Sequence, residues 1–561
     1  MKPTHRLCLG LMLLFTASRC ERVLAGSSEA PECVAITNVS VPATCVQGDT
    51  VPIVVTVVNR GVQKQSFTVR LIDTTTGTEI ASKSLMLSAV GTGGIDEIFD
   101  LAITGEVEGP TGFGDSAGVG DVNGDGCGDL LVAAAMYNHE QGRAYLYYGG
   151  KAMDDKADKR FTGENIGDGF ACCEGVCLAD MNNDGFDDVI VGARLFDRGR
   201  GRVYIFHGGP DMDEKPDVIL EAESGVKDCN FGRGIEVGDM NGDGHQDLAV
   251  TAIRYKSYTG RTYLYYGPIT SDTSASKMFT GENVDDAFGE QIATGDIDRD
   301  GCDDLLIGTL YYPRGKNQGR AYLFYGAAGT SMDETPDLIF DGEHPGDALG
   351  AAVELFDVDG DGHADVLIAA HRWPGNDTFP GRAYLYWGSD RTSMDNVPDL
   401  TFTGEADAAA SLGGRCIMGG YVNSDGYGDI LFASYNYYQL CQHGRAYLFY
   451  GNAKSSMDTV YDRAFTGEEA MCQPQRARIA DFNGDGCGDI AMFGYTYHNC
   501  QGRIWIWYGE PEDSISLTFR WDTRGVRKGK HVLRIEAGLV SGEVNTKDNI
   551  ETATVQVEEA L

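Results

Sequence analysis

The sequence is poor in three features that would each have indicated a class of protein. It has 45 Lys and Arg against 84 Asp and Glu, a formal net charge of -39. Nucleic acids and anionic membrane surfaces repel such a chain, so neither is an expected partner. Beyond the N-terminal segment no apolar run reaches the roughly 18 residues of a membrane-spanning helix. No H-E-x-x-H or P-loop motif occurs, so neither of these motifs favours catalysis.

Proline is also scarce, with 16 residues in 561, while glycine is abundant at 75 and follows no collagen-like period. This balance indicates many turns and therefore many short strands. A hydrophobic content of 42% with 10% aromatic residues argues against disorder despite the charge. The length predicts about two to four domains.

Residues 1–25 have the pattern of a signal peptide. Lys2 and Arg6 precede an apolar run at 7–17, and Val23-Leu24-Ala25 is suited to cleavage. We therefore expect a secreted or extracellular protein, or a periplasmic or cell-surface protein if the source is a bacterium.

The cysteines bear on the same expectation. Thirteen of the 15 would remain after processing, since Cys8 and Cys20 are removed with the leader. In an oxidising compartment most should form disulfides, although the pairing cannot be deduced. Cys172 and Cys173 could form a vicinal bridge or pair with separate partners.

A nine-residue motif, Asp-x-Asn/Asp-x-Asp-Gly-x-x-Asp, recurs at spacings of 57 to 64 residues. Each copy runs into an apolar strand such as 129–134, and a second strand of the Gly-Arg-Ala-Tyr type follows, as at 142–149. A period of this length with about four strands per repeat is typical of a β-propeller. The copies start at Asp121, Asp180, Asp239, Asp296, Asp357, Tyr421 and Asp481.

The seven copies predict an all-β fold with a seven-bladed propeller at 98–510. The last copy has no fourth strand after Gly509, whereas an unmatched strand, Ile98–Glu106, precedes the first copy. We expect this early strand to complete the last blade and so to close the ring.

The repeats resemble the FG-GAP repeats of the integrin α-chain propeller. Phe-Gly pairs stand at 113–114, 231–232 and 288–289, and Leu349-Gly350 is a near match. The resemblance covers about 410 of the 561 residues. It implies the propeller fold and is much less specific for function.

The nine-residue motif also has the chemistry of a cation site. Oxygen side chains at positions 1, 3, 5 and 9, with a carbonyl at 7, can surround one hard cation, and Gly at 6 permits the turn. Ligation by oxygen alone favours Ca²⁺ over soft metals. We therefore predict about six structural Ca²⁺ sites, against the alternative of Asx-rich turns without metal. The predicted side-chain ligands are Asp121, Asn123, Asp125 and Asp129; Asp180, Asn182, Asp184 and Asp188; Asp239, Asn241, Asp243 and Asp247; Asp296, Asp298, Asp300 and Asp304; Asp357, Asp359, Asp361 and Asp365; and Asp481, Asn483, Asp485 and Asp489.

The sixth copy departs from the pattern because Tyr421 replaces the first Asp. Only Asn423, Asp425 and Asp429 remain there, and we expect weak or absent binding.

The segments at 30–95 and 512–559 flank the propeller and contain strand-like stretches such as 66–73 and 530–537. Neither segment has enough strands for a β-sandwich, but together they supply roughly seven. Residues 59–61 and 542–549 resemble parts of bacterial CARDB-type immunoglobulin-like adhesion modules. This implies a small β-sandwich into which the propeller is inserted. The alternative is two unrelated flanking hairpins.

If the blades follow the integrin-like order, the loops at the end opposite the metal loops are rich in aromatic residues. Exposed aromatic rings suit sugar faces and protein hot spots. The alternative is that the first aromatic residue of each loop packs between blades. The candidates for ligand contact are Tyr258, Tyr312, Trp373, Tyr438 and Tyr497.

The sequence favours a secreted calcium-binding propeller protein that acts in recognition or adhesion without catalysis. Its expected partner is an extracellular protein or a glycan. One alternative is a secreted hydrolase, or an accessory module of one, that uses the propeller face. A second alternative is a structural surface component.

Overall fold

The computed structural model describes residues 34–40, 44–47, 50–59, 65–87, 99–106, 110–151, 153–329, 331–375, 379–405, 411–414, 416–423, 425–434, 445–466, 476–509, 514–523, 526–537 and 550–558. The chain divides into two compact units, one formed by residues 1–96 with 510–561 and the other by residues 97–509. The predicted signal peptide lies outside the described residues. No helix in the described part of the chain is long and apolar enough to cross a membrane.

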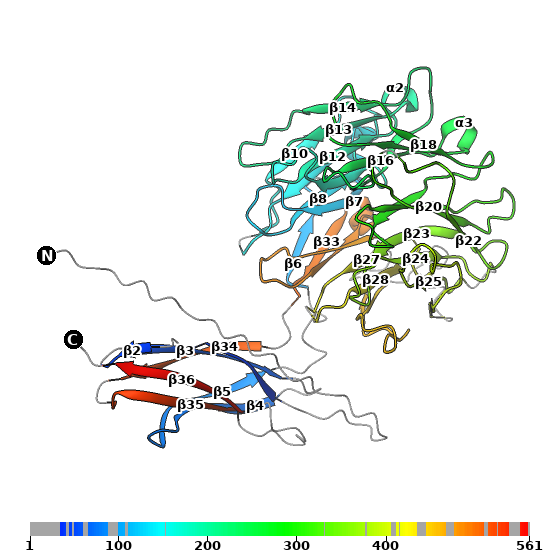
Figure 1. Ribbon diagram of the computed structural model, residues 1–561. Helices are drawn as coiled ribbons and strands as arrows, with labels where there is room; N and C mark the ends of the chain where they lie inside the picture. The colour runs from blue at the N-terminus through cyan, green and yellow to red at the C-terminus, as the bar shows by residue number, and fades with distance from the viewer. Residues whose placement is uncertain are drawn as a thin grey trace. The chain divides into compact units, whose positions relative to one another are not determined.

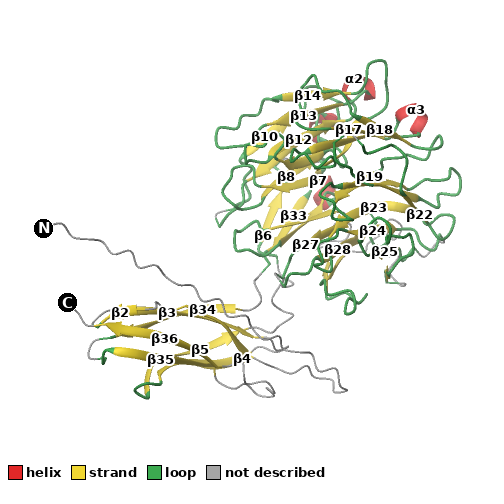
Figure 2. Ribbon diagram, viewed as in Figure 1, coloured by secondary structure: helices red, strands yellow, loops and turns green. Residues whose placement is uncertain are grey.

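The larger unit is built from four-stranded antiparallel sheets, seven of them among the described residues (Figures 1 and 2). The strands of a sheet follow one another in chain order, except in the last. The sheets are β7 (Phe113–Gly120), β8 (Asp129–Ala134), β9 (Arg143–Tyr147) and β10 (Lys159–Thr162); β11 (Val176–Ala179), β12 (Asp188–Ala193), β13 (Arg202–Phe206) and β14 (Val218–Glu221); β15 (Phe231–Gly238), β16 (Asp247–Ala252), β17 (Arg261–Tyr265) and β18 (Lys277–Thr280); β19 (Gln291–Gly295), β20 (Asp304–Thr309), β21 (Arg320–Phe324) and β22 (Leu338–Asp341); β23 (Leu349–Phe356), β24 (Asp365–Ala370), β25 (Arg382–Tyr386) and β26 (Leu400–Thr403); β27 (Cys416–Gly420), β28 (Asp429–Ser434), β29 (Arg445–Phe449) and β30 (Arg463–Thr466); and β31 (Arg476–Ala480), β32 (Asp489–Gly494), β33 (Arg503–Trp507) and β6 (Leu101–Thr104).

The last sheet joins the two ends of this unit. Its fourth strand is β6, which pairs antiparallel with β33 and brings Ile103 opposite Ile504 and Leu101 opposite Ile506. The predicted exchange of the early strand into the last repeat is therefore confirmed. In Figure 1 the orange β33 accordingly lies beside the blue β6. The repeated four-stranded sheets fit a β-propeller.

The sheets are held together by apolar faces that meet between neighbours. The second strand of each sheet is buried along its whole length, as in β8 and β12, because both of its faces pack against other sheets. One core cluster combines Leu131 of the first sheet with Val189 and Tyr204 of the second. Each large apolar side chain buried in this way contributes about 1.5–3 kcal/mol.

The strand order places the loops of each sheet at two ends. The connections from first to second strand and from third to fourth lie at one end, where Gly209 N donates to Val122 O (2.8 Å). We call this the motif end, since it holds the nine-residue motifs. The other connections lie at the opposite end, where Gly169 N donates to Glu140 O (2.8 Å). Four one-turn helices begin loops there: α1 (Tyr137–Glu140), α2 (Phe196–Gly199), α3 (Tyr255–Tyr258) and α4 (Tyr497–Cys500).

The smaller unit combines strands from both flanks of the chain in two sheets. The three-stranded sheet has the order β1 (Val34–Ser40), β3 (Thr50–Asn59), β34 (Ser514–Asp522). The five-stranded sheet has the order β2 (Thr44–Val46), β36 (Ile550–Glu558), β35 (Gly529–Ala537), β4 (Gln65–Asp73), β5 (Thr78–Leu87). Because β34 pairs with β3 and β35 with β4, the two flanks form one unit rather than separate hairpins.

The described cysteines do not match the expectation that most would pair. Six cysteines in the described part of the larger unit are free thiols: Cys127, Cys177, Cys229, Cys302, Cys416 and Cys500. Cys172 and Cys173 are also free, with their sulfur atoms 3.0 Å apart. Several of these side chains, such as Cys229 and Cys416, are buried inside the sheets, where packing rather than cross-linking accounts for them.

Candidate functional site

Each of the six complete nine-residue motifs forms a loop whose first carboxylate accepts hydrogen bonds from the loop's own backbone. In the first loop Asp121 Oδ1 accepts from Gly124 N (2.7 Å) and Asp121 Oδ2 from Gly126 N (2.9 Å). Asp125 Oδ1 accepts from Cys127 N (2.9 Å). Gly126 adopts a φ of 84°, a conformation that disfavours other residues. The loop therefore gathers the oxygen atoms of positions 1, 3 and 5 on one side of a tight turn.

The carboxylate at position 9 joins two segments of backbone. Asp129 is fully buried, and its two oxygen atoms accept from Val122 N (2.9 Å) and Gly149 N (2.7 Å). The metal ligation that the sequence predicts at this position stays a prediction beside this structural role. The same arrangement recurs at Asp188, Asp247, Asp304, Asp365, Asp429 and Asp489.

Burial of this position shifts its acidity. Desolvation raises the pKa of Asp129 to about 7 although two backbone N–H groups oppose the shift. The corresponding pKa values reach about 6 at Asp188 and about 8 at Asp489. The position 9 carboxyl is therefore expensive to ionise without a nearby positive charge.

Positions 1, 3 and 5 are the groups that can hold a cation. One carboxylate oxygen from each of Asp296, Asp298 and Asp300 lies within 4.8 Å of the others, and the same is true of Asp357, Asp359 and Asp361. Oxygen atoms on opposite sides of a Ca²⁺ ion lie about 5 Å apart, since each Ca–O distance is about 2.3–2.6 Å. The residues present therefore fit a hard divalent cation.

These two loops differ from the others by having Asp instead of Asn at position 3, and each contacts a basic side chain of the next sheet. Arg391 binds Asp298 and donates from Nη2 to Asp300 Oδ2 (2.5 Å). Lys454 Nζ lies 3.3 Å from Asp359 Oδ2 and 2.8 Å from Asp361 Oδ2. Sequence reasoning did not identify Arg391 or Lys454, although each stands three residues after the Gly that ends its third-strand motif.

In the seventh loop, which has Asn at position 3, the amide of that Asn takes the place of the basic side chain. Asn483 Nδ2 donates to Asp485 Oδ2 (3.0 Å) in the seventh loop. The substitution of Asp for Asn removes this donor and adds a charge, and the basic side chain supplies both a donor and a balancing charge. At positions 1, 3, 5 and 9 alone, a complete loop with Asn at position 3 has three Asp residues, and the fourth and fifth loops have four Asp residues with one base from the next sheet. Both sets have a formal charge of -3.

The sixth loop lacks the first carboxylate. Tyr421 is 46% exposed, and its ring lies 5.2 Å from that of Phe356. Asn423 and Asp425 bind each other, since Asn423 Nδ2 donates to Asp425 Oδ2 (3.2 Å). Asp429 still accepts from Val422 N (2.7 Å), so position 9 keeps its structural role where position 1 is lost.

At the opposite end, two of the predicted ligand-contacting aromatics, Tyr312 and Trp373, are half-buried beneath an arginine. Arg320 lies over the ring of Tyr312 at 3.8 Å and pairs with Glu282 of the preceding sheet at 3.0 Å. Arg382 lies over Trp373 at 3.4 Å. The same stacking joins Arg143 to Tyr137, Arg202 to Phe196 and Arg261 to Tyr255.

The three remaining predicted contacts have different outcomes. Tyr497 is only 8% exposed and accepts from Arg503 Nη1 (2.9 Å). The prediction that its ring faces a ligand is therefore corrected, because the ring is buried against its own sheet. Tyr438 lies outside the described residues. Tyr258 is 40% exposed and remains available.

Tyr258 belongs to an exposed apolar patch, which we define as Tyr258, Val284 and Tyr311 and call the tyrosine patch. Val284 is 47% exposed and Tyr311 is 41% exposed. Ala287 N donates to Tyr258 O (2.8 Å), which brings the loop of Val284 beside Tyr258. An ion pair of 2.8 Å between Arg314 and Asp285 joins that loop to the loop of Tyr311.

Comparisons with known proteins give the repeats a family. An FG-GAP-like repeat model matches residues 180–250, and the FG-GAP repeat model matches residues 113–147, 288–324 and 349–386. The chain therefore carries FG-GAP repeats.

Three curated relatives match part of the chain. Integrin alpha-PS2 of Drosophila melanogaster is 39% identical over 160 residues, which is 25% of this chain and 11% of the relative. Integrin alpha-5 of Xenopus laevis is 31% identical over 215 residues, 35% of this chain and 20% of the relative. Phosphatidylinositol-glycan-specific phospholipase D of Bos taurus is 34% identical over 177 residues, 28% of this chain and 21% of the relative. The chain thus spans a fifth or less of the two integrins and about a fifth of the phospholipase. Together with the FG-GAP repeats these matches support an integrin-like propeller.

Proposed function

We propose that the chain is an extracellular recognition or adhesion protein whose seven-bladed propeller is stabilised by Ca²⁺ and carries no catalytic centre. The observation that carries the calcium assignment is the repeated grouping of oxygen atoms at positions 1, 3 and 5, seen most completely in Asp296, Asp298 and Asp300. The similarity to integrin α-chains supports the recognition role.

In this proposal the ions hold the motif end and leave the opposite end for the partner. Asp296, Asp298 and Asp300, with their equivalents in the other complete loops, would hold Ca²⁺. The ion would neutralise carboxylates that otherwise repel one another across one tight turn. The two-sheet companion unit would be an immunoglobulin-like module that carries the propeller as an insertion.

The tyrosine patch is the proposed contact surface for a protein or glycan ligand. Its three exposed side chains lie on three neighbouring loops and are flanked by the Arg314–Asp285 ion pair. Aromatic side chains with a charged rim are enriched where proteins bind partners.

A binding array of extracellular proteins and glycans, probed with the full chain in Ca²⁺ and in chelator, tests this function. The triple variant Tyr258→Ala, Val284→Ser, Tyr311→Ala should lose at least about 90% of the bound signal. The matched control is Val397→Ser with Val460→Ser, which removes exposed apolar side chains (64% and 70% exposed) from the motif end. Equal binding by the two variants would place recognition elsewhere.

The match to a phosphatidylinositol-glycan-specific phospholipase D supports a second candidate, an accessory module of a hydrolase. A hydrolase screen with the same preparation separates the candidates. Turnover of any substrate by the wild-type chain would contradict the proposal of binding without catalysis.

A further inference from the structure

A cavity of about 280 Å³ lies where the first strands of the sheets meet in the larger unit. All seven sheets contribute to its lining, for example through Val119, Ile235, Val353 and Met418. The cavity lies at the inner edges of the sheets, away from the nine-residue motifs and from the tyrosine patch.

Two of the four lining glutamates have matched partners. Glu174 forms an ion pair with Arg476 and also accepts from Gln291 Nε2 (2.8 Å). Glu290 Oε1 accepts from Arg233 Nη2 (2.5 Å). These two pairs are charge-balanced, so they present no net charge to the cavity.

The other two glutamates have no such partner. Among the described residues neither Glu236 nor Glu354 forms an ion pair, which would require a basic nitrogen within 4.0 Å of a carboxylate oxygen. Arg478 also lines the cavity, but its Nη1 donates to Ala477 O (2.9 Å) and lies 3.5 Å from Met418 Sδ. Two carboxylates and one guanidinium therefore remain, with a formal charge of -1 when all are ionised.

Glu236 and Glu354 are half-buried, and this partial burial makes the two carboxylates costly to leave unpartnered. Desolvation raises the pKa of Glu236 to about 7, against the opposing effect of Arg478. Desolvation and the nearby Glu236 raise the pKa of Glu354 to about 8. A fixed positive charge close to both groups would relieve this cost.

We propose that this cavity binds a small organic cation with one ammonium group, attracted by Glu236 and Glu354, which both line it. A single positive charge balances the remaining charge, and an ammonium brings three N–H donors to a cavity lined by carboxylates. The apolar side chains Val119, Ile235 and Val353 then surround the carbon skeleton. Since a water-sized group takes about 30 Å³, the cavity has room for roughly nine such groups, far more than a bare ion needs.

This site is independent of the calcium loops and of the tyrosine patch, so its test does not depend on the proposed function. The probe is n-butylammonium, added to the full chain in Ca²⁺ and observed by saturation-transfer NMR. Butan-1-ol and butyrate have similar skeletons with neutral and negative groups. We expect saturation transfer to n-butylammonium, and binding of the other two probes at least about tenfold weaker.

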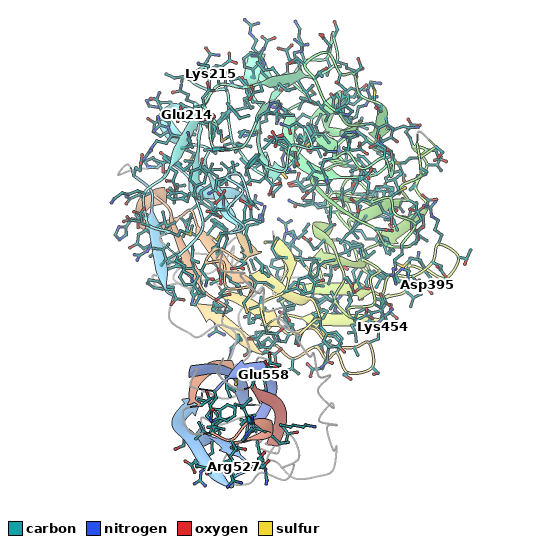
Figure 3. The ribbon with its side chains drawn as sticks, turned by 60° about the vertical axis from the view of Figure 1, so that its left-hand side comes forward. Glu214, Lys215, Asp395, Lys454, Arg527 and Glu558 are labelled. Carbon is teal, nitrogen blue, oxygen red and sulfur yellow. The ribbon has the colours of Figure 1, made fainter. Side chains whose placement is uncertain are left out.

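The variant Glu236→Gln with Glu354→Gln should weaken n-butylammonium binding by at least about tenfold. The matched control, Glu214→Gln with Asp395→Asn, removes two carboxylates from exposed loops of the same unit and should leave binding unchanged (Figure 3). Melting curves establish that both variants are folded. Absence of transfer in the wild type, equal transfer to butan-1-ol, or retained binding in the first variant would each overturn the proposal.

Discussion

Lys454 Nζ lies 2.8 Å from Asp361 Oδ2 and 3.3 Å from Asp359 Oδ2, so one ammonium group bridges two carboxylates of a neighbouring sheet's loop. Lys454 stands on the connection between β29 and β30 and is labelled in Figure 3. The Asp359 side chain is only 2% exposed, and a carboxylate so enclosed requires a positive partner. Lys454 therefore supplies to the position 5 carboxylate of the fifth loop the N–H donor that the Asn483 amide supplies in the seventh loop.

Replacing Lys454 tests whether the stability of the fifth loop depends on this ammonium group. Lys454→Met should lower the melting temperature in chelator, because Asp359 and Asp361 then repel each other without a bridge. It should also enlarge the rise in melting temperature on adding Ca²⁺, since the loop's formal charge changes from -3 to -4. Adding Asp359→Asn should restore most of the loss, with a coupling of about 0.5–1 kcal/mol, modest because Lys454 is 40% exposed. Melting curves of the single and double variants measure this coupling.

The control for this cycle is Asn483→Asp in the seventh loop. Among the described residues no basic side chain of the neighbouring sheet forms an ion pair with this loop. This change should cost stability in chelator, as Lys454→Met does. If Asp359→Asn gave no recovery in the Lys454→Met background, Lys454 would not be the partner of position 3.

Removing calcium should destabilise the larger unit. Each site held at about 100 times its dissociation constant contributes about 2.7 kcal/mol, so chelation should lower the melting temperature. Asp243→Ala removes position 5 of a complete loop and should shrink the chelation shift by about a sixth. Asp425→Ala in the sixth loop is the matched control and should leave the shift nearly unchanged. A wild-type melting temperature that does not respond to chelator would refute the metal assignment.

Position 9 should behave as a structural residue whether or not metal is bound. In Asp129→Asn, in a complete loop, one of the two backbone donors, Val122 N or Gly149 N, loses its acceptor. The expected loss is about 1–3 kcal/mol, the cost of a buried unsatisfied donor. Chemical denaturation in Ca²⁺ and in chelator should give the same loss. A loss seen only in Ca²⁺ would instead make Asp129 a ligand.

The repeat architecture was predictable because each copy carries its own complete signal. The spacing of the motif, the buried strand after it and the unmatched strand at 98–106 together predicted that β6 pairs with β33, and the pairing is present. Strand existence depends on local pattern, and the pattern is repeated often enough to average out local ambiguity.

What the sequence did not reveal depends on contacts between repeats. Arg391 and Lys454 occupy ordinary loop positions, and only their placement beside the preceding sheet's Asp residues gives them a role. A carboxylate looks the same in sequence whether it binds an ion or backbone N–H groups, so the two backbone hydrogen bonds of position 9 were not predicted. Tyr312 is half-buried because Arg320, which lies on β21, stacks on its ring.

The glutamates of the central cavity predict a dependence on pH. The pKa of Glu354 is raised from 4.5 to about 8 by burial and by Glu236, while Arg478 opposes the shift. Between these values the folded chain keeps a proton that the unfolded chain has lost, so unfolding releases it and stability falls as pH rises. Glu354→Gln removes this term. The melting temperature of the variant relative to wild type should therefore rise from about pH 5 to about pH 8 and then level off.

Differential scanning calorimetry of wild type and variant across this range measures the difference directly. Other titrating groups act on both proteins and largely cancel, including Glu174, which also faces the cavity. Glu214→Gln, an exposed carboxyl on the connection between β13 and β14, should give a difference that stays flat over the same range. A flat profile for Glu354→Gln would mean that water or a bound cation already solvates the Glu354 carboxylate in the folded chain. A rising profile that n-butylammonium flattens would show that the ligand charge and the proton compete for the same two carboxylates.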